Sequence, residues 1–196
     1  MRSGYGQWRF DALLTTSRHA PHLRRPLQFH QPHETDCGIV TTYKRNNNMI
    51  TIEQALRIAI DAHEGQKDLD GKPVILHPLT VGLAGNNREE MIAGFLHDVV
   101  EDTVMTFEDL LQLGVDEIIV DALRLLTHAE DITYEEYVKR IATSGNDIAI
   151  HVKYNDLCHN LKRGRAGGHT KQVQKHEKAL SIIEPILEGA LIKPIV

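Results

Sequence analysis

The chain has few cysteines, few aromatic residues and no long apolar run. Cys37 and Cys158 are the only two cysteines among 196 residues, and they lie far apart without CxxC spacing. This pattern excludes a disulfide framework and is typical of a reducing compartment, so we expect a cytoplasmic protein. No apolar stretch approaches the roughly 20 residues that a transmembrane helix needs. We therefore expect no membrane partner.

Aromatic residues make up only 5% of the sequence, whereas leucine and isoleucine are frequent and recur at helical spacing. No alternation typical of strands and no internal repeat is visible. A chain of 196 residues can form one domain with a full core but not two substantial domains. We therefore predict a single all-α domain.

The first 48 residues differ in composition from the rest of the chain. They hold seven basic and three acidic residues, whereas the whole chain has a net charge of −5. Histidines and prolines interrupt any periodicity there, and no apolar stretch typical of a secretory signal is present. We expect residues 1–48 to be a disordered extension, or an artefact of an upstream start codon, with the domain spanning residues 49–196. A basic arm that binds nucleic acid is the alternative, but its scattered charge makes a nucleic-acid partner unlikely.

From Thr51 onward the sequence predicts one helix after another. Thr51 and Gln54 form a capping-box pattern at the start of the first helix. The glycine-rich segment 164–168 fits either a mobile loop at the mouth of a site or a simple turn between helices. The predicted helices span residues 51–64, 78–84, 88–101, 106–113, 116–127, 133–143, 147–162 and 170–188.

The string Phe-Leu-His-Asp-Val-Val-Glu-Asp carries the strongest functional signal. Its polar residues are His97, Asp98, Glu101 and Asp102, and they interrupt an otherwise apolar helix. In an α-helix Glu101 would stack above His97, and Asp102 above Asp98. Three carboxylates and one imidazole on one side of a helix would repel one another unless a cation lay among them. The alternative is a histidine near a solvated acidic helix end.

Two further segments offer ligands for such a cation. Pro78 disfavours helical geometry at His77, so we expect His77 in an extended or turn conformation just before a helix. Lys153, Asp156 and Asn160 fall along one helical stripe, where a metal and a phosphate could bind side by side. The alternative for this stripe is an exposed helix face with an ordinary Lys-Asp pair.

The residue types suggest a chemistry of their own. Imidazole nitrogens and carboxylate oxygens together suit a divalent cation such as zinc or manganese. Such a metal makes hydroxide available near neutral pH, and Glu101 could take the proton from the water. A basic rim for substrate phosphates is then required, and it is found in four residues, although a basic surface turn would look the same. These residues are Lys153, Lys162, Arg163 and Arg165.

The pattern His-Pro, His-Asp-x-x-Glu-Asp and Lys-x-x-Asp-x-x-His-Asn resembles the HD-domain metal phosphohydrolases over residues 50–163. Within them it is most similar to the (p)ppGpp hydrolase domain of the RelA/SpoT family and its small stand-alone relatives, which use manganese to remove a 3′-pyrophosphate. The resemblance implies an HD-domain helical bundle and a stringent-response nucleotide as substrate. It implies that the metal ligands are His77, His97, Asp98 and Asp156, that Glu101 and Asp102 position or activate the attacking water, and that Asn160 and Lys153 lie at the nucleotide.

The sequence departs from this family at the positions that would recognise guanine. Where long family members carry a basic pair against the base, this chain has Asp68 and Leu69, with only Lys67 nearby. Leu157 replaces an arginine, and Arg163 replaces a small hydroxyl residue. The reaction type therefore transfers better than the base specificity.

Three functions follow from these patterns. The first is metal-dependent hydrolysis of (p)ppGpp or a related 3′-phosphorylated nucleotide, with Lys67, Lys153, Asn160, Lys162 and Arg163 as substrate-binding residues. The second is hydrolysis of another nucleotide, such as a nucleoside monophosphate. The third is a nucleotide-sensing module without turnover, against which the intact Glu101-Asp102 pair weighs. The remaining residues leave no room for a synthetase domain, so we do not expect a bifunctional enzyme.

Overall fold

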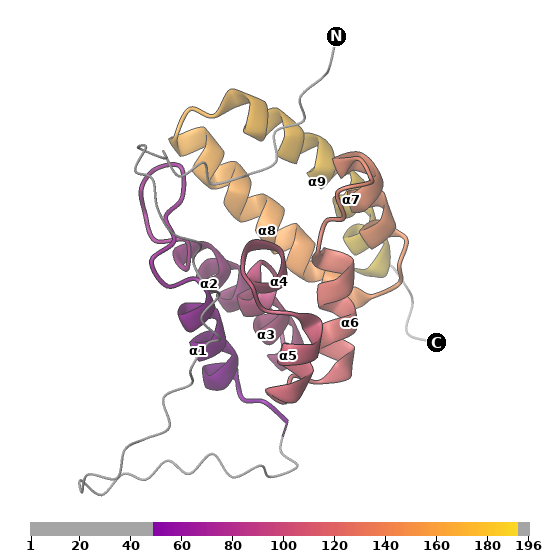
Figure 1. The fold of residues 1–196 in the computed structure, drawn as a ribbon. Coiled ribbons are helices and arrows are strands. Elements are labelled where there is room, and N and C mark those ends of the chain that lie inside the picture. The colour runs from indigo at the N-terminus through magenta and orange to yellow at the C-terminus, as the bar shows by residue number, and fades with distance from the viewer. Residues whose placement is uncertain (1–48, 192–196) are drawn as a thin grey trace, which may run out of the picture. The chain divides into compact units, whose positions relative to one another are not determined.

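The computed structural model of the protein describes residues 49–191 (Figure 1). The predicted disordered extension, residues 1–48, lies outside the described residues. Within the described range the chain forms helices and no strand, and one isolated bridge pairs Lys67 with Pro73. The all-α prediction is therefore confirmed for this part of the chain. The helices are α1 (Ile52–Ala62), α2 (Leu76–Leu83), α3 (Arg88–Leu96), α4 (Val99–Asp102), α5 (Phe107–Gln112), α6 (Glu117–Leu126), α7 (Tyr134–Ala142), α8 (Asp147–Ala166) and α9 (Thr170–Leu191).

Local capping signals explain where several helices begin. At three helix starts a threonine hydroxyl accepts a hydrogen bond from the third backbone N–H of the helix, and that third residue's side chain accepts one from the threonine N–H. This reciprocal arrangement satisfies backbone donors that the first turn would leave without partners. The paired residues are Thr51 with Gln54, Thr106 with Asp109, and Thr133 with Glu136.

Helices α2 and α3 form an antiparallel hairpin with an unusually close approach. A Cβ atom added at Gly94 would lie 2.7 Å from the Cα atom of Gly82. Side chains at either position would force the helices apart, so the two glycines allow their backbones to touch. Because the hairpin is antiparallel, His77 near the start of α2 and His97 just after α3 lie at the same end.

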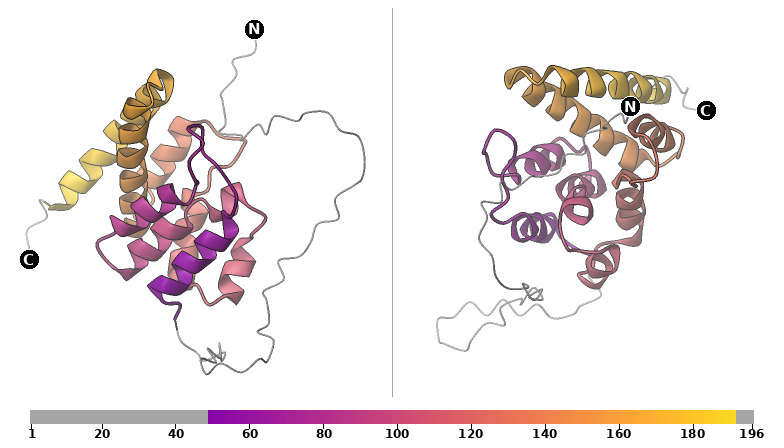
Figure 2. Two further views of the ribbon diagram at one scale, coloured as in Figure 1. Left: turned by 90° about the vertical axis from the view of Figure 1, so that its left-hand side faces the viewer. Right: turned by 45° about the horizontal axis from the view of Figure 1, so that its top comes forward.

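Helix α8 runs through the centre of the domain and packs against α2, α3, α6, α7 and α9. Figure 2 shows α9 lying along α8, on the side away from α1. The core between these helices is apolar, with fully buried side chains from several helices. They include Ile92, Phe95, Leu96, Leu123, Ile141, Leu157 and Ile183.

Two sequence expectations about the site helices are wrong. His77 does not precede α2 but lies in its first turn, where Pro78 is tolerated because the first N–H groups of a helix have no acceptor within it. The predicted helix 88–101 is interrupted at His97 and Asp98. The Nδ1 atom of His97 lies 2.8 Å from the carbonyl of Gly94, which a continuous helix would offer to the N–H of Asp98.

The glycine-rich segment 164–168 is divided between the end of α8, residues 164–166, and the short turn to α9 at Gly167 and Gly168. Helix α8 continues to Ala166, beyond its predicted end at Lys162. Gly164 lies inside α8, where a Cβ atom would come within 3.0 Å of the Val173 side chain in α9. None of the helices in residues 49–191 combines the length and the apolar character needed to cross a membrane.

Candidate metal centre

His97 occupies the junction between α3 and α4 and is only 5% exposed. Its Nδ1 atom lies 2.8 Å from the carbonyl oxygen of Gly94 and therefore carries the proton. The Nε2 atom then presents a lone pair, and it is buried without a hydrogen-bond partner in the structure. A buried nitrogen without a partner is costly, so this atom calls for a ligand.

His77 faces His97 from the first turn of α2, with the two ring centroids 5.1 Å apart. Its Nε2 atom lies 3.1 Å from Oδ1 of Asp156 and 3.6 Å from Oδ2 of Asp98. Its other ring nitrogen, Nδ1, lies 2.8 Å from Nδ1 of His159 on α8. The ring is thus fixed on one side, while Nε2 faces the carboxylates.

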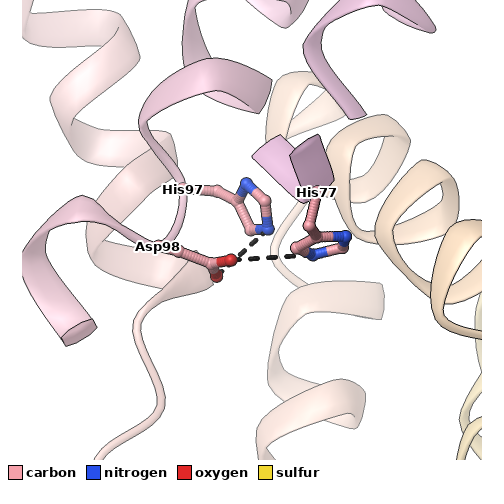
Figure 3. A group of neighbouring side chains, drawn as sticks. All are labelled: His77, His97 and Asp98. Atoms are coloured by element: carbon pink, nitrogen blue, oxygen red, sulfur yellow. Dashed lines mark ion pairs between the residues drawn. The ribbon is translucent and has the colours of Figure 1, made fainter. Parts of the chain in front are cut away.

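The Asp98 carboxylate lies beside the two neighbouring imidazoles and faces both of them, as Figure 3 shows. Its Oδ1 atom is 3.1 Å from Nε2 of His97, and the ligand atoms of His77, His97 and Asp98 all lie within 4.8 Å of one another. Asp156 approaches the same place from α8, with Oδ1 3.9 Å from Nε2 of His97. Of the four residues that the sequence suggested as metal ligands, His77, His97 and Asp98 thus form one close group, and Asp156 lies against its two histidines.

This donor set fits a divalent cation. Two imidazole nitrogens and two carboxylates converge from α2, the α3–α4 junction and α8. Mixed nitrogen and oxygen donors suit zinc, manganese or iron rather than calcium or copper(I). The unpartnered Nε2 atom of His97 is the observation that tests this fit, because a bound cation would give that atom a partner.

Asp156 is held by two neighbours on its own helix. The ammonium of Lys153 lies 2.8 Å from Oδ2, and the amide of Asn160 donates to Oδ1 at 2.5 Å. Burial alone would raise the pKa of Asp156, but Lys153 and His77 outweigh it and hold this pKa well below its usual range. The carboxylate is therefore kept charged and oriented.

The acidic pair after the metal residues lies on the short helix α4. Burial raises the pKa of Glu101, and the neighbouring Asp98 adds to the shift, while the backbone N–H of His128 donates to Oε2 at 3.0 Å and opposes it. Burial, with repulsion from Asp98 and Glu101, raises the pKa of Asp102 to about 7. Both carboxyl groups can therefore exchange protons closer to neutral pH than ordinary carboxyls do.

The loop before α2 is tied to this acidic pair. The side chain of Gln66 donates to the backbone carbonyl of Asp102 at 3.0 Å, and its Oε1 atom lies 2.8 Å from Nδ1 of His63. His63 is buried at the end of α1. His63 and Gln66 thus hold the end of α4 in place.

The basic residues expected at the substrate occupy different environments. Lys153 is buried against Asp156, and Arg163 lies 2.6 Å from Asp68 in the loop before α2. Lys162 and Lys67 are exposed. The two cations nearest to the core are therefore already bound to carboxylates of the protein.

Sequence reasoning missed His159. Its ring stacks on that of His77, with centroids 5.0 Å apart and planes inclined by 11°. Burial, with repulsion from His77 and Arg163, lowers the pKa of His159 to about 4, so the ring is neutral. Its helical spacing from Asp156 could have indicated it, because residues three apart share a face of a helix.

HD-domain proteins are helical domains in which an adjacent histidine and aspartate lie close to a second histidine and a second aspartate. The arrangement of His97 and Asp98 beside His77 and Asp156 is of this class. No family model matches the chain. The curated relatives, however, include the bifunctional (p)ppGpp synthase/hydrolase SpoT of Escherichia coli, which is 31% identical over 160 residues, covering 76% of this chain and 23% of that protein. The guanosine-3′,5′-bis(diphosphate) 3′-pyrophosphohydrolase of Aquifex aeolicus is 32% identical over 147 residues, covering 70% and 20%.

A solved structure described as a metazoan ortholog of SpoT that hydrolyzes ppGpp has the same fold. It matches with a TM-score of 0.51 and 20% identity, covering 76% of this chain and 98% of that one. The chain is thus a homologue of the SpoT/RelA-type (p)ppGpp hydrolase/synthetase proteins. It spans less than a quarter of the length of the curated relatives it matches.

Proposed function

We propose that the protein is a metal-dependent hydrolase that removes the 3′-pyrophosphate from (p)ppGpp or a closely related phosphorylated nucleotide. The observation that carries this proposal is the close approach of two imidazole Nε2 atoms to the carboxylates of Asp98 and Asp156, with the Nε2 atom of His97 buried and without a hydrogen bond. The names of the relatives supply the reaction and the nucleotide.

In this proposal His77, His97, Asp98 and Asp156 hold a divalent metal, which is manganese. Such a metal, when bound, would lower the pKa of a coordinated water molecule and polarise a phosphoryl oxygen of the phosphate group that the water attacks. The protein orients both imidazoles for metal binding. The Nδ1 atom of His97 is bonded to the Gly94 carbonyl and that of His77 to His159, which leaves both Nε2 atoms facing the site. The free thiol of Cys158 is consistent with a cytoplasmic location.

Glu101 and Asp102 are proposed to carry out the proton transfers of the reaction. Glu101 takes a proton from the attacking water, and its raised pKa brings it closer to the range where a general base is efficient. The hydrogen bond from the N–H of His128 orients its carboxylate while the other oxygen can reach the water. Asp102, whose pKa is about 7, accepts or returns a proton beside it.

The substrate contacts are proposed for residues around this centre. Asn160 and the exposed Lys67 and Lys162 are available for the nucleotide and its phosphates. Lys153 acts mainly by neutralising Asp156, because its ammonium is buried on that carboxylate. Arg163 reaches a nucleotide only if it exchanges its bond to Asp68 for one to the substrate.

The test combines metal analysis with product analysis. The purified protein should contain or bind about one manganese per chain, and with manganese it should release pyrophosphate from ppGpp and leave GDP. A variant in which His97 is replaced by Gln should lose both properties. Metal binding without release of pyrophosphate or phosphate from any nucleotide would contradict hydrolysis and favour a nucleotide-sensing module.

A second candidate, hydrolysis of another nucleotide such as a nucleoside monophosphate, is favoured by one contact. Asp68 lies where a basic residue would contact guanine in long family members, and its carboxylate is bonded to Arg163. This leaves an acidic residue at the proposed base position. A panel of nucleotides with different bases and phosphate positions, compared by kcat/KM, separates the two candidates.

A further inference from the structure

Two tyrosines of α7 connect the metal centre to helix α9. The ammonium of Lys153, which is bonded to Asp156, lies 5.3 Å from the ring centre of Tyr134 and 4.9 Å from that of Tyr137. The backbone N–H of His128 donates to Glu101, and the ring centre of His128 lies 6.0 Å from that of Tyr134. Tyr134 therefore touches the partners of two site carboxylates, Asp156 and Glu101.

Lys175 of α9 lies over the same ring. Its Nζ atom is 3.7 Å from the ring centre of Tyr134, a close cation–π contact, and its side chain is half-buried. Helices α7 and α9 pack against each other, as Figure 1 shows. Within residues 49–191 no carboxylate forms an ion pair with Lys175, in contrast to Lys153 and Arg163.

The charges that act on Lys175 belong to the site. Burial lowers the pKa of Lys175, repulsion from Lys153 adds to the effect, and Asp156 and Glu101 oppose it. These two carboxylates come from α8 and α4. Lys175 shares the Tyr134 ring with Lys153, which is bonded to Asp156, but it is itself paired with no carboxylate of residues 49–191, so its ammonium has hydrogen bonds left to donate.

We propose that Lys175, supported by the Tyr134 ring, binds the pyrophosphate group of the substrate at the metal centre. This inference rests on the proposed function. Lys153 and Arg163 are bound to Asp156 and Asp68, so the substrate phosphates need another cation, and Lys175 is that cation. A pyrophosphate would give the ammonium the charged partner that it lacks, and charge-assisted hydrogen bonds of this kind are strong. Contact with the Tyr134 ring already restricts the position of the Lys175 ammonium. The side chain therefore loses less conformational freedom when pyrophosphate binds.

The test measures binding of inorganic pyrophosphate to the manganese-loaded full chain by calorimetry. We expect Lys175→Gln to weaken binding by about 10- to 100-fold, as for loss of a hydrogen bond to a charged group. The control is Lys178→Gln, which removes the same charge from the same helix at a side chain that is 79% exposed. It should bind pyrophosphate within about twofold of wild type. Tyr134→Leu should weaken binding and Tyr134→Phe should not, because phenylalanine keeps the ring.

Metal content and hydrolysis separate this inference from the proposed function. If wild type hydrolyses ppGpp but Lys175→Gln, with unchanged manganese content, binds pyrophosphate and substrate as tightly as wild type does, the role of Lys175 is overturned while the function stands. If wild type hydrolyses no nucleotide, the proposed function fails. Loss of pyrophosphate binding in Lys175→Gln alone would still support the assignment of Lys175.

Discussion

Arg163 and Asp68, which are 95 positions apart in sequence, form an ion pair with 2.6 Å between Nη2 and Oδ2. These are two of the positions at which the sequence departs from the long RelA/SpoT-type enzymes. The other Asp68 oxygen, Oδ1, accepts the N–H groups of Asp70 and Lys72, so the same carboxylate also organises the loop before α2. The ion pair therefore attaches that loop to α8.

We expect this ion pair to contribute measurably to stability. Because its side chains are only 29% and 11% exposed, a double-mutant cycle with Arg163→Met and Asp68→Asn should give a coupling energy of about 1 kcal/mol in urea unfolding. The Arg165–Glu177 pair, 63% and 48% exposed, is the control and should give less than about 0.5 kcal/mol. Equal coupling in the two pairs would show that the Asp68 contact has no special role.

Glu101 and Asp98 should separate catalysis from metal binding. Glu101→Gln keeps the shape of the side chain but removes the base, so turnover should fall by roughly 10²- to 10⁴-fold while manganese is retained. Asp98→Asn should instead lose the metal, because the Asp98 carboxylate faces both imidazoles, with its oxygens 3.6 Å and 3.1 Å from their Nε2 atoms. Metal content by elemental analysis, measured beside pyrophosphate release, checks both variants. Full activity in both would refute these role assignments.

His159 should act through His77. His159→Phe keeps a ring to stack on His77 but removes the nitrogen that lies 2.8 Å from its Nδ1 atom. We expect manganese affinity to fall by about 10- to 100-fold, as is typical when a residue that orients a metal-bound histidine is lost. Cys158→Ala, at the neighbouring position, is the control. Unchanged affinity in His159→Phe would mean that α2 alone orients His77.

Asp102 should make the metal-free protein more stable in mild acid. Its pKa in the folded state, about 7, lies above the ordinary 3.8, so the folded protein binds a proton that the unfolded chain does not bind between these values. Stability from this group therefore rises as pH falls from about 7 towards 4, and is lost as pH rises again. Thermal melts of wild type and Asp102→Asn without metal should differ at pH 8, with the variant more stable, and converge near pH 4. The opposite order at pH 8 would show that Asp102 has a partner we have not identified.

Removing residues 1–48 should leave the domain intact. This extension, which lies outside the described residues, has few periodic apolar residues with which to offset the roughly 1–2 kcal/mol cost of ordering each backbone unit. Thr51 caps α1 within the remaining chain. A protein that starts at Met49 should keep its helicity, thermal midpoint and nucleotide hydrolysis. A large loss of stability would place the domain boundary elsewhere.

The helices were predictable from sequence where their signals are local. Thr51, Thr106 and Thr133 begin helices because each reciprocal cap involves residues only three positions apart. The break at His97 was not predictable, because it depends on which carbonyl the imidazole binds, and apolar periodicity continues through it. Pro78 misled the prediction for His77 because a preference against helix at the preceding residue is weaker than the packing of α2 on α3.

The candidate site was predictable in its residue types but not in its pairings. His77, His97, Asp98 and Asp156 are recognisable because these side chains are rare in apolar surroundings. The sequence could not show that Lys153 and Arg163 are bound to Asp156 and Asp68, since such bonds depend on tertiary distances. Lys175 was missed for the same reason, because its relevance depends on the ring of Tyr134.

The contact between Gly82 and Gly94 determines how far apart the two metal-site histidines can be. It lies inside the α2–α3 hairpin, where a methyl group at Gly94 would meet the backbone of α2, and one at Gly82 would meet the buried ring of Phe95 in α3. A shift of either helix would also move His77 or His97, which lie at the open end of the same hairpin. If the proposed metal binds there, the size of cation that fits between the two histidines is thus set partly by two residues that have no side chain.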